Sequence, residues 1–265
     1  MKEDFAMFMT RFTRLETGMR LGLSLALTVL AVETHGQGPA AAGAGGQDKI
    51  AALKESIAQN QAALKTYKWT EATEISLKGE VKKKEQKECR YGPDGKVQKT
   101  AIAGADQAPK EEKDSGRGGR RGGGAVKKAI VENKVDDMKE YMEKAAALVQ
   151  EYVPPDPQKI QAAAAAGKIS TQAASGQGGV STLTIKDYVK AGDQLVLGFD
   201  PVAKKLRSYK VQSYVEKPKD DAVTLAVTFA SLADGTNYPQ QTVLDVAAKK
   251  INVKVVNSGY AKAGQ

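Results

Sequence analysis

The chain from residue 178 onward alternates apolar and polar residues in a way that restricts it to β-structure. In its most regular stretch, Val223, Leu225, Val227 and Phe229 lie on one side of an extended chain, with threonine and alanine on the other. A period of two residues is typical of a half-buried strand, because successive side chains point to opposite faces. We predict strands, separated by turns, at 180–188, 195–199, 206–215, 222–232, 241–246 and 251–257.

A second block of strands is predicted near the N-terminal end. The alternation over 67–77 places Trp69, Ile75 and Leu77 on one face. The next strand, 81–91, carries charge on both faces, which suits an exposed edge or rim. A Gly-Pro-Asp-Gly turn then leads into a third strand, so these strands form an antiparallel meander.

Two apolar stripes of helical period accompany the strands. One covers 48–65, and the other covers 131–152 and includes Met138 and Met142. Asp156 and Pro157 predict a short further helix that ends at Gly167. An antiparallel sheet with helices on one face would bury both stripes, which predicts an α+β fold.

The remaining segments complete the predicted organisation. A Gly/Arg-rich loop at 103–124 and a helical insertion at 125–167 interrupt a single domain over 48–260, because the first strands alone would bury too little to fold independently. An Ala/Gly linker precedes this domain and a short tail follows it. These two segments are 37–47 and 261–265.

The N-terminus resembles an export signal. An uncharged apolar run at 21–32 follows Arg20, and it is too short for a hydrocarbon core of about 30 Å. We therefore expect residues 1–36 to be a cleaved secretory signal peptide, with an N-terminal anchor as the alternative. On this interpretation the protein is exported to the periplasm or cell envelope.

The composition excludes most catalytic chemistry. The chain has one histidine, His35, inside the predicted signal peptide, and one cysteine, Cys89. A mature chain without histidine has no Ser-His-Asp triad, no Cys-His dyad and no histidine-bound metal. Catalysis by carboxylate, lysine or tyrosine stays open, but no motif marks it. We expect a non-catalytic protein without a cofactor or metal.

The net charge of +9 favours anionic partners, a membrane surface among them. Two Arg-Gly-Gly triplets lie in the 103–124 loop. Such triplets occur in nucleic-acid-binding segments, but here they lack interleaved aromatic residues, so we interpret the segment as a solvated loop and not as a nucleic-acid site. The candidate residues for binding an anionic surface are Lys82, Lys83, Lys84, Arg117, Arg120 and Arg121.

The order helix, strands, helical insertion, strands resembles the periplasmic outer-membrane lipoprotein carrier family (LolA) and its lipid-binding relatives. The local similarities are the sequence LKTYKW at 64–69 and LADGTNYP at 232–239, in which Asp234, Gly235 and Pro239 match a turn between two late strands of that family. The resemblance implies a curved antiparallel sheet of about eight to ten strands, an incomplete β-barrel whose concave face is covered by helices and accepts acyl chains.

This resemblance predicts a carrier for a lipid or an acylated protein. For each candidate residue that would line its cavity, ordinary core packing is the simpler interpretation. The alternative function is an envelope interaction domain with a filled core that binds anionic surfaces through its basic segments. The candidate lining residues are Trp69, Ile75, Leu77, Met138, Met142, Val223, Leu225, Val227 and Phe229.

Overall fold

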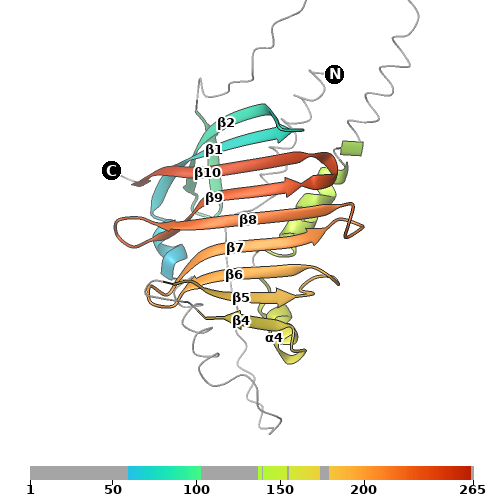
Figure 1. Cartoon of the computed structure of the whole chain (residues 1–265). Helices are drawn as coiled ribbons and strands as arrows, with labels where there is room; N and C mark the ends of the chain where they lie inside the picture. Colours follow the sequence, from blue (N-terminus) through green and yellow to red (C-terminus); the bar gives the residue numbers. More distant parts are fainter. Residues whose placement is uncertain (1–58, 103–136, 139, 154, 174–178, 264–265) are drawn as a thin grey trace, which may run out of the picture.

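The computed structural model describes residues 59–102, 137–138, 140–153, 155–173 and 179–263, and its main feature is one antiparallel sheet of ten strands (Figure 1). The strand order is β3-β2-β1-β10-β9-β8-β7-β6-β5-β4. The strands are β1 (Tyr67–Leu77), β2 (Glu80–Tyr91), β3 (Val97–Ala101), β4 (Ile169–Gln172), β5 (Ser181–Lys186), β6 (Gln194–Asp200), β7 (Lys205–Tyr214), β8 (Ala222–Ser231), β9 (Asn237–Val246) and β10 (Ile251–Lys262).

The sheet is built from two meanders joined side by side. Strands β4 to β10 follow one another in space as in sequence, and β1 then pairs with β10, followed by β2 and β3. The sheet is open, with β3 and β4 at its two ends, and it is not closed into a barrel. Because β1 and β10 are antiparallel partners from Tyr67↔Lys262 to Leu77↔Ile251, the two blocks of strands share one sheet.

The predicted strands are present, with four differences. Strand β2 is an edge over only part of its length, because β3 pairs with its outer side at Lys87–Tyr91, whereas residues 80–85 are paired with β1 alone in the described structure. Strand β9 begins at Asn237, before the predicted 241–246, and contains Pro239 next to a register shift opposite Phe229. Strand β10 continues to Lys262, into the predicted tail, and β4 is an additional short strand.

The described helices are short. Residues 59–64 and 140–150 are helical, as are 137–138, and α4 covers Pro157–Ala165. The side chain of Asp156 caps α4 by accepting a hydrogen bond from the backbone N of Gln158 at 2.8 Å, as predicted. Figure 1 shows the helix at 140–150, in yellow-green, and α4 behind the sheet.

Several predicted segments lie outside the described residues. These are the signal peptide, the linker, most of the first helix, the Gly/Arg-rich loop and the start of the long helix. Within the described part of the chain, no helix is both long and apolar enough to cross a membrane.

Candidate functional site

One face of the sheet, which we call the inner face, carries an apolar row from β1 to β4. Side chains on neighbouring strands are direct cross-strand partners in this row, so they share one face. Nearly all of them belong to the hydrophobic core. In sheet order they are Ile75, Val253, Leu244, Leu225, Val211, Leu195, Ile185 and Ile169.

The helix at 140–150 packs on this face through the stripe predicted from the sequence. Met142, Ala145 and Val149 are each no more than 2% exposed and belong to the same core cluster as Leu225. The Tyr141 hydroxyl donates to Asp221 in the β7–β8 turn at 3.2 Å. The helix therefore lies near the end of the sheet where the β5–β6, β7–β8 and β9–β10 turns are found.

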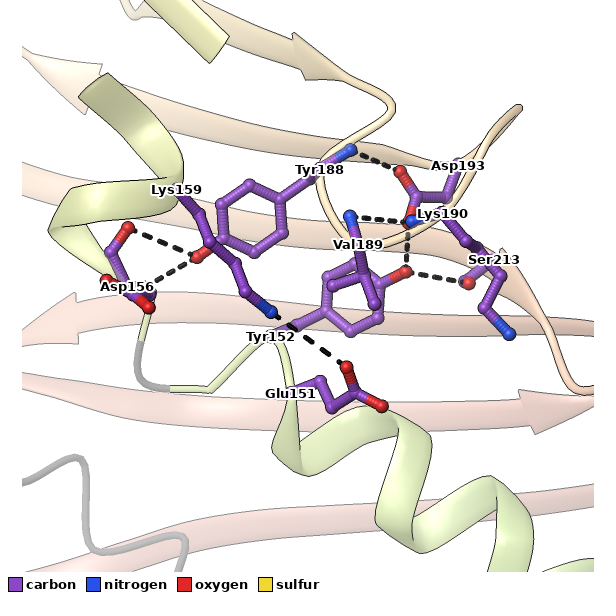
Figure 2. A network of polar contacts seen from close by, with 9 residues as sticks. All are labelled: Glu151, Tyr152, Asp156, Lys159, Tyr188, Val189, Lys190, Asp193 and Ser213. Atoms are coloured by element: carbon purple, nitrogen blue, oxygen red, sulfur yellow. Dashed lines mark hydrogen bonds and ion pairs between the residues drawn. The ribbon is translucent and has the colours of Figure 1, made fainter. Parts of the chain in front are cut away.

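A buried aspartate anchors the C-terminal end of this helix (Figure 2). Asp193, in the β5–β6 turn, is 1% exposed, and its carboxylate accepts a hydrogen bond from the Tyr152 hydroxyl. The same carboxylate accepts backbone N–H groups of Tyr188 at 2.6 Å, Val189 at 3.0 Å and Lys190 at 2.8 Å. Burial, followed by the hydrogen bond to Asp193, raises the pKa of Tyr152, so the hydroxyl stays protonated.

The remaining partners of Tyr152 also come from the sheet. Ser213 on β7 lies 2.8 Å from the Tyr152 hydroxyl oxygen, and the Tyr209 hydroxyl donates to the Tyr152 carbonyl. Because one phenol group donates a single proton, which goes to Asp193, Ser213 must donate to Tyr152. This network fixes the helix end to the sheet, and its groups satisfy one another, which is typical of a structural contact.

An aromatic cluster occupies the inner face near the opposite end of the sheet. The rings of Trp69 and Tyr260 are stacked, with centroids 5.6 Å apart and an interplanar angle of 10°. The ring centroid of Tyr91 lies 5.6 Å from that of Trp69, and the ring centroid of Tyr238 lies 4.4 Å from that of Tyr260. These four side chains come from β1, β2, β9 and β10, so the cluster joins the two blocks of strands.

Buried ion pairs lie beside the aromatic cluster. The Lys99 ammonium group contacts both carboxylate oxygens of Glu71, at 2.7 and 2.9 Å, and Glu71 is 8% exposed. Glu85, 6% exposed, pairs with Lys83 and with Lys87. Burial is the largest single influence on the pKa of Glu85, and it raises that pKa. The hydrogen bonds from the two lysines together outweigh burial, so the pKa of Glu85 is lowered.

Cys89 is fully buried between these groups. Burial raises the pKa of its thiol to about 12, so the thiol stays protonated at neutral pH.

The structure brings together all the candidate lining residues except Trp69. Five are in the core cluster, and Leu77, Met138 and Phe229 are partly buried against it. Trp69 instead belongs to the aromatic cluster. The five core members are Ile75, Met142, Val223, Leu225 and Val227.

The three described basic candidates each have an acidic neighbour. Lys82 pairs with Glu80 at 2.6 Å, Lys84 pairs with Glu74 at 2.8 Å, and Lys83 pairs with the buried Glu85. Each pair partly neutralises the charge of its lysine, so the three lysines together form only a weak positive patch. Arg117, Arg120 and Arg121 lie outside the described residues.

Sequence reasoning missed the aromatic cluster and the buried ion pairs. Tyr91 and Tyr238 lie at the ends of their strands, where alternation is weak, and Tyr260 lies beyond the predicted end of its strand. The inward direction of Glu85 follows from its pairing with Thr73. The charge of β2 and both of its neighbouring strands were predicted from the sequence, but the burial of Glu85 between Lys83 and Lys87 was not.

Comparisons with known proteins assign no family to this chain. No protein-family model and no curated protein matches the chain. Among solved structures, it is similar to a DUF1329 family protein from Desulfovibrio piger ATCC 29098, with 10% identity, a TM-score of 0.35, and coverage of 81% of this chain and 93% of that chain. At this identity and TM-score, the similarity assigns neither a family nor an activity to this chain.

Proposed function

We propose that the protein is an exported, non-catalytic carrier or binding protein for an acylated or otherwise hydrophobic ligand, such as a lipid or a lipoprotein acyl chain. The observation that carries the proposal is the uninterrupted apolar row of the inner face, which belongs to the same core as Met142 of the helix at 140–150 and against which Met138 also packs. Methionine suits such a surface because its unbranched side chain adapts to different neighbours. In this proposal the inner face is the concave face of a partial barrel.

The ligand would replace contacts between the helix and the sheet. The C-terminal end of the helix is fixed by Tyr152, whereas Met138 and Tyr141 near its N-terminal end are only partly buried. This asymmetry supports entry of the ligand from the Met138 side, with Tyr152 as the fixed point. An acyl chain of about 14 methylenes, at about 0.8 kcal/mol each, gains about 11 kcal/mol on burial, before the cost of ordering.

A second function is an envelope interaction domain with a filled core, which binds anionic surfaces through basic segments. The observation that favours it is the close packing of the helix on the sheet, since Ala145 and Tyr152 are both 0% exposed. The two functions differ in whether an apolar ligand enters the protein, and this difference is measurable.

The test compares two substitutions on the same strand. Val227 lies on the inner face and Thr228 is exposed on the other face. We expect Val227→Glu to abolish uptake of a fluorescent fatty acid, because its carboxylate would lose its hydration among apolar groups, whereas Thr228→Glu should bind as wild type. Undiminished uptake by a folded Val227→Glu variant would contradict a ligand site on the inner face.

A further inference from the structure

Two buried polar atoms on the inner face have no hydrogen-bond partner within the described structure. They are the indole Nε1 of Trp69 and the side-chain Oδ1 of Asn257, in residues that are 8% and 9% exposed. Glu85 Oε1 also lacks a hydrogen bond of good geometry, but the Lys83 ammonium lies against it. Because an unsatisfied buried donor or acceptor is costly, native proteins rarely leave one without a ligand or water.

The two residues are near neighbours on the sheet. Asn257 on β10 is the direct cross-strand partner of Glu71, and Trp69 is two residues before Glu71 on the same face of β1. Trp69 and Asn257 therefore lie diagonally to each other on neighbouring strands, where the β1–β10 register shifts between Lys68 and Thr70.

The surrounding contacts show which of the two atoms is a donor and which is an acceptor. Asn257 donates from Nδ2 to the Pro239 carbonyl at 2.8 Å, which leaves Oδ1 as an acceptor. The Trp69 ring stacks on Tyr260 and contacts Tyr91, and these contacts restrict the direction of its N–H. A ligand group at this point must accept one hydrogen bond and donate another.

The two unpaired atoms also favour a neutral ligand group. A cationic group would only donate and would leave the Trp69 N–H without an acceptor, whereas an anionic group would place its charge against Asn257 Oδ1, which is itself an acceptor. The nearby carboxylates of Glu71 and Glu85 are already paired with lysines, and a further buried charge would be costly to desolvate.

We propose that Trp69 and Asn257 recognise the secondary amide of an N-acylated ligand, with its carbonyl on Trp69 Nε1 and its N–H on Asn257 Oδ1. An amide presents its acceptor and donor on different atoms that point in opposite directions, which suits two protein groups on neighbouring strands. The inner face becomes more apolar from Asn257 through Val255 to Val253, so the acyl chain extends along this direction toward the core. The assignment rests on the proposed function and names the chemistry of its ligand.

The test compares two ligands that differ in one group, N-palmitoylglycine methyl ester and its ester analogue, in which oxygen replaces the amide N–H. Trp69 is the only tryptophan of the chain, so its fluorescence reports binding at this point alone. We expect wild type to bind the amide about tenfold more tightly, because the ester leaves Asn257 Oδ1 without a donor.

Substitutions assign the preference to these residues. In Asn257→Ala the preference for the amide should disappear, whereas Asn252→Ala, on the opposite face of β10, should keep it. In Trp69→Phe, measured by calorimetry, both ligands should bind about tenfold more weakly and the preference should remain.

The outcomes separate the two proposals. Tight binding of both ligands by wild type with equal affinity would overturn amide recognition and leave the carrier function standing. Binding of neither ligand would overturn the carrier function and amide recognition together. A preference that survives in folded Asn257→Ala would also overturn the assignment.

Discussion

At the scale of single residues, Tyr152 connects the helix at 140–150 to the sheet. Its hydroxyl is shared between Asp193 and Ser213, and all three side chains are buried. Tyr152→Phe should destabilise the protein by about 1–3 kcal/mol, because Asp193 and Ser213 each lose a buried partner. Urea unfolding measures this change, and Tyr214→Phe, whose hydroxyl bond to Ala191 is exposed, is the matched control. Equal stability of the two variants would show that the network contributes nothing.

Asp234, in the β8–β9 turn, gives a pH-dependent contribution to stability. Its carboxylate accepts a hydrogen bond from the Tyr67 hydroxyl at 2.5 Å, which, together with Thr236, lowers its pKa from 3.8 to about 2. A lowered pKa in the folded state means that the ionised form stabilises the fold. The contribution is complete above pH 4 or so and is lost as the pH falls through about 2.

Asp234→Asn keeps an acceptor for Tyr67 but not the charge. We expect the variant to be less stable than wild type at pH 7 and the difference to shrink as the pH is lowered toward 2, measured by thermal unfolding. A difference in stability that stays constant from pH 7 to 2 would contradict this role of the carboxylate.

Single residues also show how far the sequence alone could predict the site. Val223, Leu225 and Val227 were predicted to share a buried face, and they do, because alternation determines the facing of a strand regardless of its partners. Trp69 and Asn257 could not be identified as neighbours, because they lie on strands joined only by the long-range β1–β10 pairing.

At the scale of elements, the burial of residues in the helix at 140–150 follows the apolar period of its sequence. Ala145 is 0% exposed against the sheet, whereas Ala147 is exposed on the same helix. Ala145→Leu should cost about 1–3 kcal/mol by overpacking, and Ala147→Leu should be close to neutral. Chemical denaturation of both variants checks this. If Ala145→Leu were tolerated as well as Ala147→Leu, the helix would not be tightly seated, and the interface would already contain space.

The predicted boundaries of the elements fail where the local pattern is interrupted. Strand β9 starts before its clear alternation, because Pro239 lies beside a register shift and is accommodated there. Strand β4 was missed because Ile169–Gln172 is short and polar, and it becomes a strand by pairing with β5. The turn at 232–236 was predicted, and it closes with Leu232 and Thr236 as hydrogen-bonded ends.

At the scale of the whole molecule, one sheet places two different environments on the same face. The core half, toward the β5–β6, β7–β8 and β9–β10 turns, is apolar and carries the helix, and the other half, toward the opposite ends of β1, β2, β9 and β10, contains the aromatic cluster with the buried ion pairs beside it. This division fits an amphipathic ligand, with its chain in the core half and its polar group beside Trp69. The sequence predicted an antiparallel sheet on which the apolar stripes of the helices pack, but it did not predict where the polar half of that face lies.

The most direct test of ligand binding is native mass spectrometry of the protein purified gently from a bacterial periplasm, with organic extraction of the same sample. We expect wild type to carry stoichiometric lipid or acylated peptide and Val227→Glu to have the mass of the chain alone. A wild-type protein that is free of ligand and also does not bind added fatty acids or N-acyl amides would contradict the carrier function and favour a filled core.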